Sequence, residues 1–155
     1  MGGGDSVFDR SRAYRSITRG VLGEYLMMKS KIKTLPERIA TETSRLTSIR
    51  SATSESSAVA GTGANVRQER DTAIIAERDR LTAELDLATR EVQCIEHALS
   101  LLNEKELRTV QLMDIDHQFG AVDRLCSEFN YCKSMVYNIH DDALDKFSMA
   151  YNGSK

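Results

Sequence analysis

The sequence predicts an all-α protein in which a long helical hairpin precedes a C-terminal helix-turn-helix. Two long segments carry apolar residues at heptad spacing, a helix-capping motif follows the second segment, and a short helix, a tight turn and a longer helix are predicted after it. Aromatic residues make up only 6% of the chain and Trp is absent, which suits helices that pack through aliphatic stripes. We expect a flexible tail over 1–15, a hairpin over 16–102 with a mobile linker at 51–67, a helix-turn-helix domain over 103–150 and a tail over 151–155.

The first helix of the hairpin is predicted by an apolar stripe that repeats about every three or four residues. Its members are Tyr25, Met28, Ile32, Leu35, Ile39, Leu46 and Ile49, with Glu42 in the slot between Ile39 and Leu46. Pro36 falls inside the stripe, and proline lacks an N–H and clashes with the preceding helical turn. We therefore expect helix on both sides of Pro36, with either a kink there or a restart that places Pro36 in a first turn.

The second helix of the hairpin is predicted by a stripe with alternating gaps of four and three residues, which is typical of a coiled coil. Arg78 is the one charged residue on this stripe, and its apolar members form the seam of the hairpin: Ile74, Leu81, Leu85, Ala88, Val92, Ile95, Leu99 and Leu102. Small and polar residues between the two stripes cannot bury enough apolar area to offset chain entropy, so a mobile linker is expected there. The stripes are buried either within one chain or between two chains in a four-helix bundle, and we predict a homodimer.

A capping box marks the start of the next helix. Asn103 can accept a hydrogen bond from the first helical turn, and Glu106, three residues later, can reach back to the Asn103 amide. The motif predicts a helix from about Glu104 to Asp116, and Gly120 is expected to end the loop after it.

The last part of the chain has the pattern of a helix-turn-helix. Leu125 and Phe129 lie one turn apart on a short first helix, and Asn130 can adopt the left-handed backbone that such a turn requires. The second helix is predicted to bury one stripe of residues: Val136, His140, Ala143, Leu144 and Phe147.

Charge is distributed unevenly along the chain. Residues 1–50 carry ten Lys or Arg against five Asp or Glu, whereas residues 51–102 carry five against nine and residues 103–155 carry six against nine. The basic N-terminal third is therefore expected either to pair with the acidic remainder or to present its basic face to a polyanion.

A family resemblance rests on the helix-turn-helix residues. The run Leu125-Cys126-x-x-Phe129-Asn130-Tyr131-Cys132-x-x-Met135-Val136, followed by Ala143-Leu144-x-x-Phe147, resembles region four of sigma-70 factors. The run Val136-Tyr137-x-Ile139-His140-x-x-Ala143-Leu144, behind a hairpin with a Ser/Thr/Gly-rich linker, resembles small phage-encoded proteins of that type, the group of the ArpU autolysin regulator and related late-transcription regulators. The resemblance implies a phage or prophage protein that regulates transcription by binding promoter or operator DNA.

Two sets of residues are expected to contact double-stranded DNA. Base readout is predicted for the first exposed turns of the second helix, at Lys133, Ser134, Tyr137 and Asn138. Contacts to the DNA backbone would come from the N-terminal third, at Arg10, Arg12, Arg15, Arg19, Lys29, Lys31 and Lys33.

The sequence also departs from the sigma pattern in a way that supports a second function. Sigma-like recognition helices carry basic residues where this chain has Tyr137, Ile139, Asp141 and Asp142, and phosphate neutralisation supplies most nonspecific DNA affinity. The alternative is a phage protein-interaction module that keeps the fold but contacts a host protein, such as RNA polymerase or a defence nuclease.

Other functional classes lack a sequence signal. No Ser/His/Asp arrangement or Gly-rich fingerprint is present, so neither an enzyme nor a cofactor is expected. The three Cys residues form no CxxC pair, and Cys94 and His97 match no zinc-site spacing, so free thiols and no metal are expected. Apolar runs are too short for a membrane helix or a secretory signal, and the cytoplasm of a bacterial host cell is the expected location.

Overall fold

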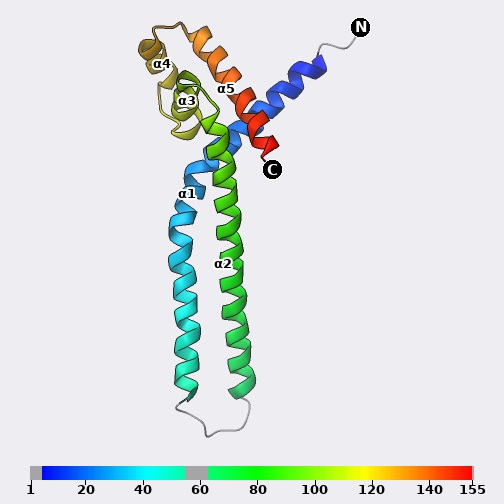
Figure 1. Cartoon of the computed structure of the whole chain (residues 1–155), viewed down its shortest axis with the longest axis vertical. Helices are drawn as coiled ribbons and strands as arrows, with labels where there is room; N and C mark the ends of the chain where they lie inside the picture. Colours follow the sequence, from blue (N-terminus) through cyan, green and yellow to red (C-terminus); the bar gives the residue numbers. More distant parts are fainter. Residues whose placement is uncertain (1–4, 55–62, 155) are drawn as a thin grey trace. The chain divides into compact units, whose positions relative to one another are not determined.

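The computed structural model describes residues 5–54 and 63–154, and these residues are all-α (Figure 1). The helices are α1 (Asp5–Ser54), α2 (Gly63–Ser100), α3 (Glu104–Val110), the π-helical turn η1 (Gln111–Ile115), α4 (Ala121–Phe129) and α5 (Lys133–Gly153). The predicted fold class is therefore confirmed at the level of an all-helical chain with a long hairpin. No described helix combines the length and apolar character that crossing a membrane requires.

The helices extend into segments that the sequence assigned to tails and a linker. α1 begins at Asp5 rather than after residue 15, and α1 and α2 together take up both ends of the 51–67 linker. α5 likewise continues to Gly153 and buries Tyr151. The physical reason is that a formed helix gains one hydrogen bond for each residue added, so polar flanks can continue it. The centre of the predicted linker, 55–62, lies outside the described residues, as do 1–4 and 155.

Pro36 lies inside α1, with helix on both sides as expected. Its missing N–H removes one main-chain hydrogen bond. The helical residues on either side, together with buried Leu35, hold the segment in place.

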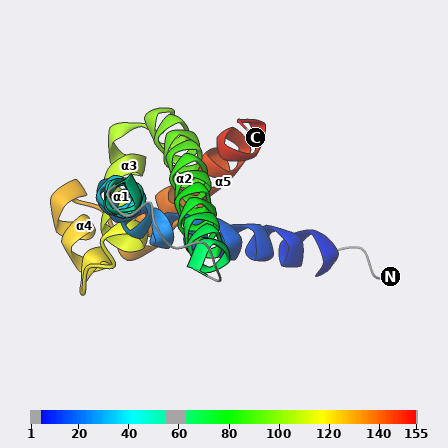
Figure 2. The same cartoon turned by 90° about the horizontal axis from the view of Figure 1, so that it is seen from below.

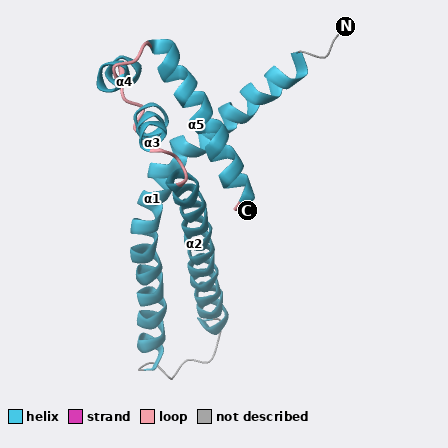
Figure 3. Ribbon diagram, turned by 45° about the horizontal axis from the view of Figure 1, so that its top comes forward, coloured by secondary structure: helices cyan, strands magenta, loops and turns pink. Residues whose placement is uncertain are grey.

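The chain forms two compact units. One of them contains residues 29–90. This unit is an antiparallel pair of helices, seen as the lower part of α1 and α2 in Figures 1 and 3. Its buried apolar residues are Leu35, Leu46, Ile74, Leu81 and Ala88. At its surface, Lys31 Nζ lies 3.0 Å from Glu84 Oε1.

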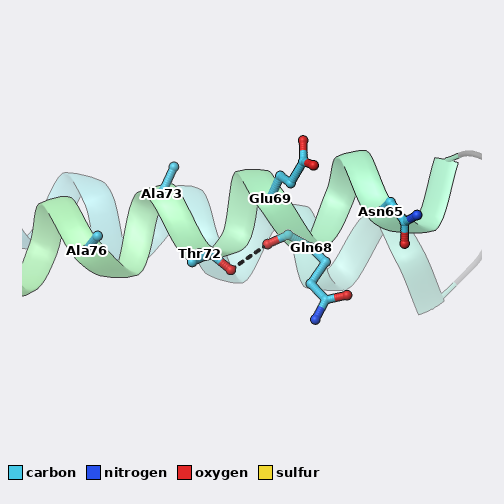
Figure 4. A pocket seen from close by; sticks show the side chains of 6 residues that line it. All are labelled: Asn65, Gln68, Glu69, Thr72, Ala73 and Ala76. Atoms are coloured by element: carbon cyan, nitrogen blue, oxygen red, sulfur yellow. Dashed lines mark hydrogen bonds between the residues drawn. The ribbon is translucent and has the colours of Figure 1, made fainter.

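The solvated face of α2 carries a hollow lined only by exposed polar and small residues (Figure 4). Thr72 Oγ1 in this hollow donates a hydrogen bond of 2.7 Å to the Gln68 carbonyl. The hydroxyl is thus satisfied by its own helix, as Thr side chains in helices commonly are.

The second unit contains 1–28 together with 91–155. Its main core joins Leu22 of α1 and Ile95 of α2 with Val110, Leu144 and Phe147, whose exposed fractions are 0 or 1%. The Phe147 ring stacks on Tyr151 with centroids 5.6 Å apart. Figure 2 shows α3, α4 and α5, which follow α2 in the chain and complete this unit.

The predicted seam residues are divided between the units. Leu85 and Leu99 are half-buried and the other six are buried. Residues from Val92 onward belong to the unit that contains the chain's C-terminal helices, so the heptad stripe continues beyond the hairpin. A single amphipathic helix thus supplies core residues to both units.

Candidate functional site

The turn between α4 and α5 is built from residues with defined backbone geometry. Asn130 closes α4 with φ 56° and ψ 46°, the left-handed conformation that the sequence predicted. The Tyr131 amide donates to the Cys126 carbonyl at 3.0 Å. Cys132 then adopts extended backbone at the N-cap of α5, which begins at Lys133. Asn tolerates this conformation better than most residues because its short polar side chain can hydrogen-bond to the local backbone.

A small apolar core fixes the angle between these two helices. Leu112, Ala121, Leu125 and Val136 are all buried there, and Leu125 and Val136 have no exposed surface. The Phe129 and Tyr131 rings pack edge to face beside this core, with centroids 6.2 Å apart. This packing leaves the opposite side of the first turns of α5 exposed.

The four predicted base-reading residues lie on that exposed side. Lys133, Ser134, Tyr137 and Asn138 are all exposed, and Tyr137 retains 50% of its surface. They occupy positions i, i+1, i+4 and i+5 of α5, so they share one face of the helix. The structure therefore brings the four together.

Two of the four already have partners within the chain. Lys133 Nζ lies 2.8 Å from Asp123 Oδ1, and this hydrogen bond raises the pKa of Lys133. Ser134 Oγ lies 3.1 Å from Cys132 Sγ, and this contact, aided by backbone N–H groups, lowers the pKa of the Cys132 thiol. Because Lys133 and Asp123 are both solvent-exposed, their ion pair can exchange for another partner.

The predicted backbone-contacting residues are divided between the two units. Arg10 has no described side chain, Arg12 is exposed near the start of α1, and Lys29 and Lys33 are exposed in the other unit. Lys31 in that unit is paired with Glu84. The arginines therefore lie on the first part of α1, in the unit that contains α5, and the lysines lie on the part of α1 that belongs to the unit of residues 29–90.

Arg15 connects α1 to the acidic face of α5. Its guanidinium donates to Asp141 Oδ2 at 2.9 Å and to both carboxylate oxygens of Asp145 at 2.9 and 2.7 Å. Planar bidentate pairing of this kind is the geometry in which Arg–carboxylate contacts are strongest. The hydrogen bond with Asp145 raises the pKa of Arg15. Pairing between the basic N-terminal third and the acidic remainder is thus observed at this contact.

Asp114 forms a buried ionic contact that the sequence did not indicate. Its carboxylate has no exposed surface and lies in η1, where the wider π-helical turn follows directly on α3. Asp114 Oδ1 accepts from Arg19 Nε at 2.9 Å, and Oδ2 lies 2.6 Å from His140 Nε2. Burial of a carboxylate requires such partners. Because Arg19 comes from α1 and His140 from α5, the network joins three elements of this unit.

A cavity of about 570 Å³ opens beside this network. Its lining comes from α1, η1 and α5: Arg12, Arg15, Ser16, Arg19, Met113, Tyr137, His140, Asp141 and Leu144. The structure therefore places three of the predicted backbone-contacting arginines around one hollow with Tyr137, a predicted base-reading residue. The regular spacing of Arg12, Arg15 and Arg19, together with Asp141 and Asp145 one turn apart, is the sequence signal for this arrangement.

Comparison of the chain with protein-family models, curated proteins and solved structures gives no match. Within residues 5–54 and 63–154, no three His, Cys, Asp or Glu side chains are grouped as a metal site.

Proposed function

We propose that the chain is a transcriptional regulator of a phage or prophage that binds double-stranded DNA through the first turns of α5. The observation that carries this proposal is the exposed face of Lys133, Ser134, Tyr137 and Asn138 on a helix held by a left-handed turn after α4. A helix presented in this way has the width and the donor groups needed to read the major groove.

The ion pairs of Arg15 give further support. Asp141 and Asp145 on α5 would repel a phosphate backbone, but both carboxylates accept hydrogen bonds from Arg15. The single positive charge of Arg15 offsets one of these two negative charges, which weakens their repulsion of a phosphate backbone. Dimerisation through the hairpin remains part of this proposal.

A selection from a random pool of DNA duplexes, with binding followed by fluorescence anisotropy, tests the proposal. We expect one sequence motif to be enriched and its affinity to fall as salt rises. Asn138→Ala should reduce discrimination between the enriched and a scrambled duplex by about tenfold, the scale of one good base contact. Asn152→Ala, a matched exposed amide near the other end of α5, should leave discrimination unchanged. Failure to enrich any motif at low salt would refute DNA readout.

A protein-interaction module is the second candidate, and two observations favour it. Met135 and Tyr137 leave 46% and 50% of their surface exposed on the first turns of α5. The only cation on those turns, Lys133, is paired with Asp123. In that case no DNA motif is enriched, and purified bacterial RNA polymerase binds the chain in the absence of DNA, with weaker binding for Tyr137→Ala.

A further inference from the structure

We infer that the cavity between α1 and α5 is a binding site for a phosphate group. This inference does not require base readout by α5, because the arginines of the site are not among the residues predicted to read bases, and only Tyr137 belongs to both sets. Three arginines, Arg12, Arg15 and Arg19, line the cavity together with Asp141, while Asp145 and Asp114 bond to Arg15 and Arg19 from outside the lining. The three carboxylates balance the three guanidinium charges, so affinity for a phosphate comes from guanidinium N–H donors that the internal contacts leave unused.

The arginines keep donors that their internal contacts do not use. A guanidinium has five N–H donors, and Arg19 uses only its Nε toward Asp114 among the described contacts. Arg19 also leaves 55% of its side chain exposed. Arg12 is exposed and has no ion pair or hydrogen bond with any residue of the described chain. Both side chains can therefore donate to an oxyanion without breaking a contact that holds the fold.

The site is preorganised by groups that are already fixed. The buried Asp114 carboxylate orients Arg19, and the two carboxylates of Asp141 and Asp145 orient Arg15. Arg side chains held in this way lose little conformational freedom when they bind a phosphate, and their planar forks match its oxygens. Ser16 and Tyr137 add hydroxyl groups to the lining.

Two sources can supply such a phosphate group: the backbone of bound DNA, or a free phosphorylated small molecule. The cavity volume of about 570 Å³ lies within the range of small-molecule sites. The chemistry that recognises the group is the same in both cases, so the experiment must distinguish the sources.

Amide NMR titration of the full chain with inorganic phosphate, at an ionic strength held constant with chloride, tests the inference. We expect saturable shifts at Arg12, Ser16 and Tyr137. Arg12→Gln should weaken phosphate binding about tenfold, the loss expected for a charge-assisted contact. Arg124→Gln, an exposed arginine of α4 outside the cavity lining, serves as the matched control and should change nothing.

The same variants are then compared for affinity toward a DNA duplex. A loss of DNA affinity in Arg12→Gln alone identifies the DNA backbone as the source, and unchanged or absent DNA binding with weakened phosphate binding identifies a free phosphorylated molecule. Absent DNA binding with intact phosphate binding would count against the proposed function and leave the site standing. The inference is overturned if phosphate shifts do not saturate, or if Arg12→Gln and Arg124→Gln respond to phosphate alike.

Discussion

Several charged residues of the described chain form ion pairs with internal partners. Arg15, Arg19 and Lys31 each form an ion pair with an acidic residue from a distant part of the sequence. The sequence indicates that basic and acidic regions could pair, but it cannot choose the partners, because the pairing depends on which helix faces pack together. Asp114 is the clearest example, since it is fully buried and its partners, Arg19 and His140, come from α1 and α5.

Glu106 provides a pH-dependent test at the residue scale. Burial would raise its pKa, but hydrogen bonds from Lys146 and from the Asn103 amide outweigh this effect and lower the pKa of Glu106. A carboxylate with a lowered folded-state pKa stabilises the fold above its unfolded pKa, about 4.3 for Glu, and this contribution is lost as pH falls toward the folded-state pKa.

Glu106→Gln should therefore lower the free energy of unfolding at pH 7, and the difference from the native chain should shrink below about pH 4.3. Urea denaturation at a series of pH values measures this difference. Glu104→Gln, an exposed neighbour in the same first turn, is the control. An equal loss at neutral and acidic pH would show that the Lys146 contact contributes nothing through charge.

Individual helices differ in how far the sequence predicts them. The capping box at Asn103 and Glu106 is present with both hydrogen bonds, at 2.9 and 3.0 Å. It was predictable because its two residues lie within one helical turn of each other in the sequence. The left-handed Asn130 is local in the same sense. By contrast, the helix predicted over 104–116 is α-helical only to Val110 and π-helical to Ile115. Such a change of helix type depends on tertiary packing, which periodicity does not reveal.

Two glycines of α1 allow a matched test of helix stability. Gly20 has open space where a Cβ would be added, whereas a Cβ at Gly23 would lie 3.3 Å from His117 Nε2. Gly20→Ala should raise the free energy of unfolding by about 1 kcal/mol, because alanine loses less backbone entropy in a helix. Gly23→Ala should gain less, since His117 must move. Thermal or urea denaturation would measure both, and a larger gain at Gly23 would contradict the packing of His117 against α1.

At the scale of the whole molecule, the heptad stripes predict the hairpin and its long helices. The stripes cannot show where the chain divides into units, because the same periodic pattern continues from Ala88 to Val92 across the boundary. The exposed residues of the candidate site were predictable from the left-handed turn at Asn130 and from the buried stripe of α5, which together fix the side of the helix that faces solvent. The cavity was not, because it requires α1 to lie against α5. The helical spacing of Arg12, Arg15 and Arg19 and of Asp141 and Asp145 places each set on one helix face, but it does not show that the two faces meet.

Substitution of two leucines tests the seam of the hairpin. Leu81 is 1% exposed and Leu87 is 68% exposed, although both lie on α2 in the same unit. Leu81→Asp places a carboxylate in an apolar seam and should destabilise the unit by about 3 kcal/mol or more. Leu87→Asp should have little effect. Circular dichroism during urea denaturation measures the loss, and similar behaviour of the two variants would contradict the assigned seam.

The division of the chain has a consequence for the order of events during synthesis. Residues 29–90 are contiguous, so the hairpin can form as soon as they leave the ribosome, whereas the other unit must wait for α5, whose Asp145 binds Arg15 across 130 positions. Early pairing of the hairpin helices shortens the effective loop that this late contact must close, and a shorter loop carries a smaller entropic penalty. Formation of the hairpin during translation would thereby make contact between the N-terminal part of α1 and α5 more probable.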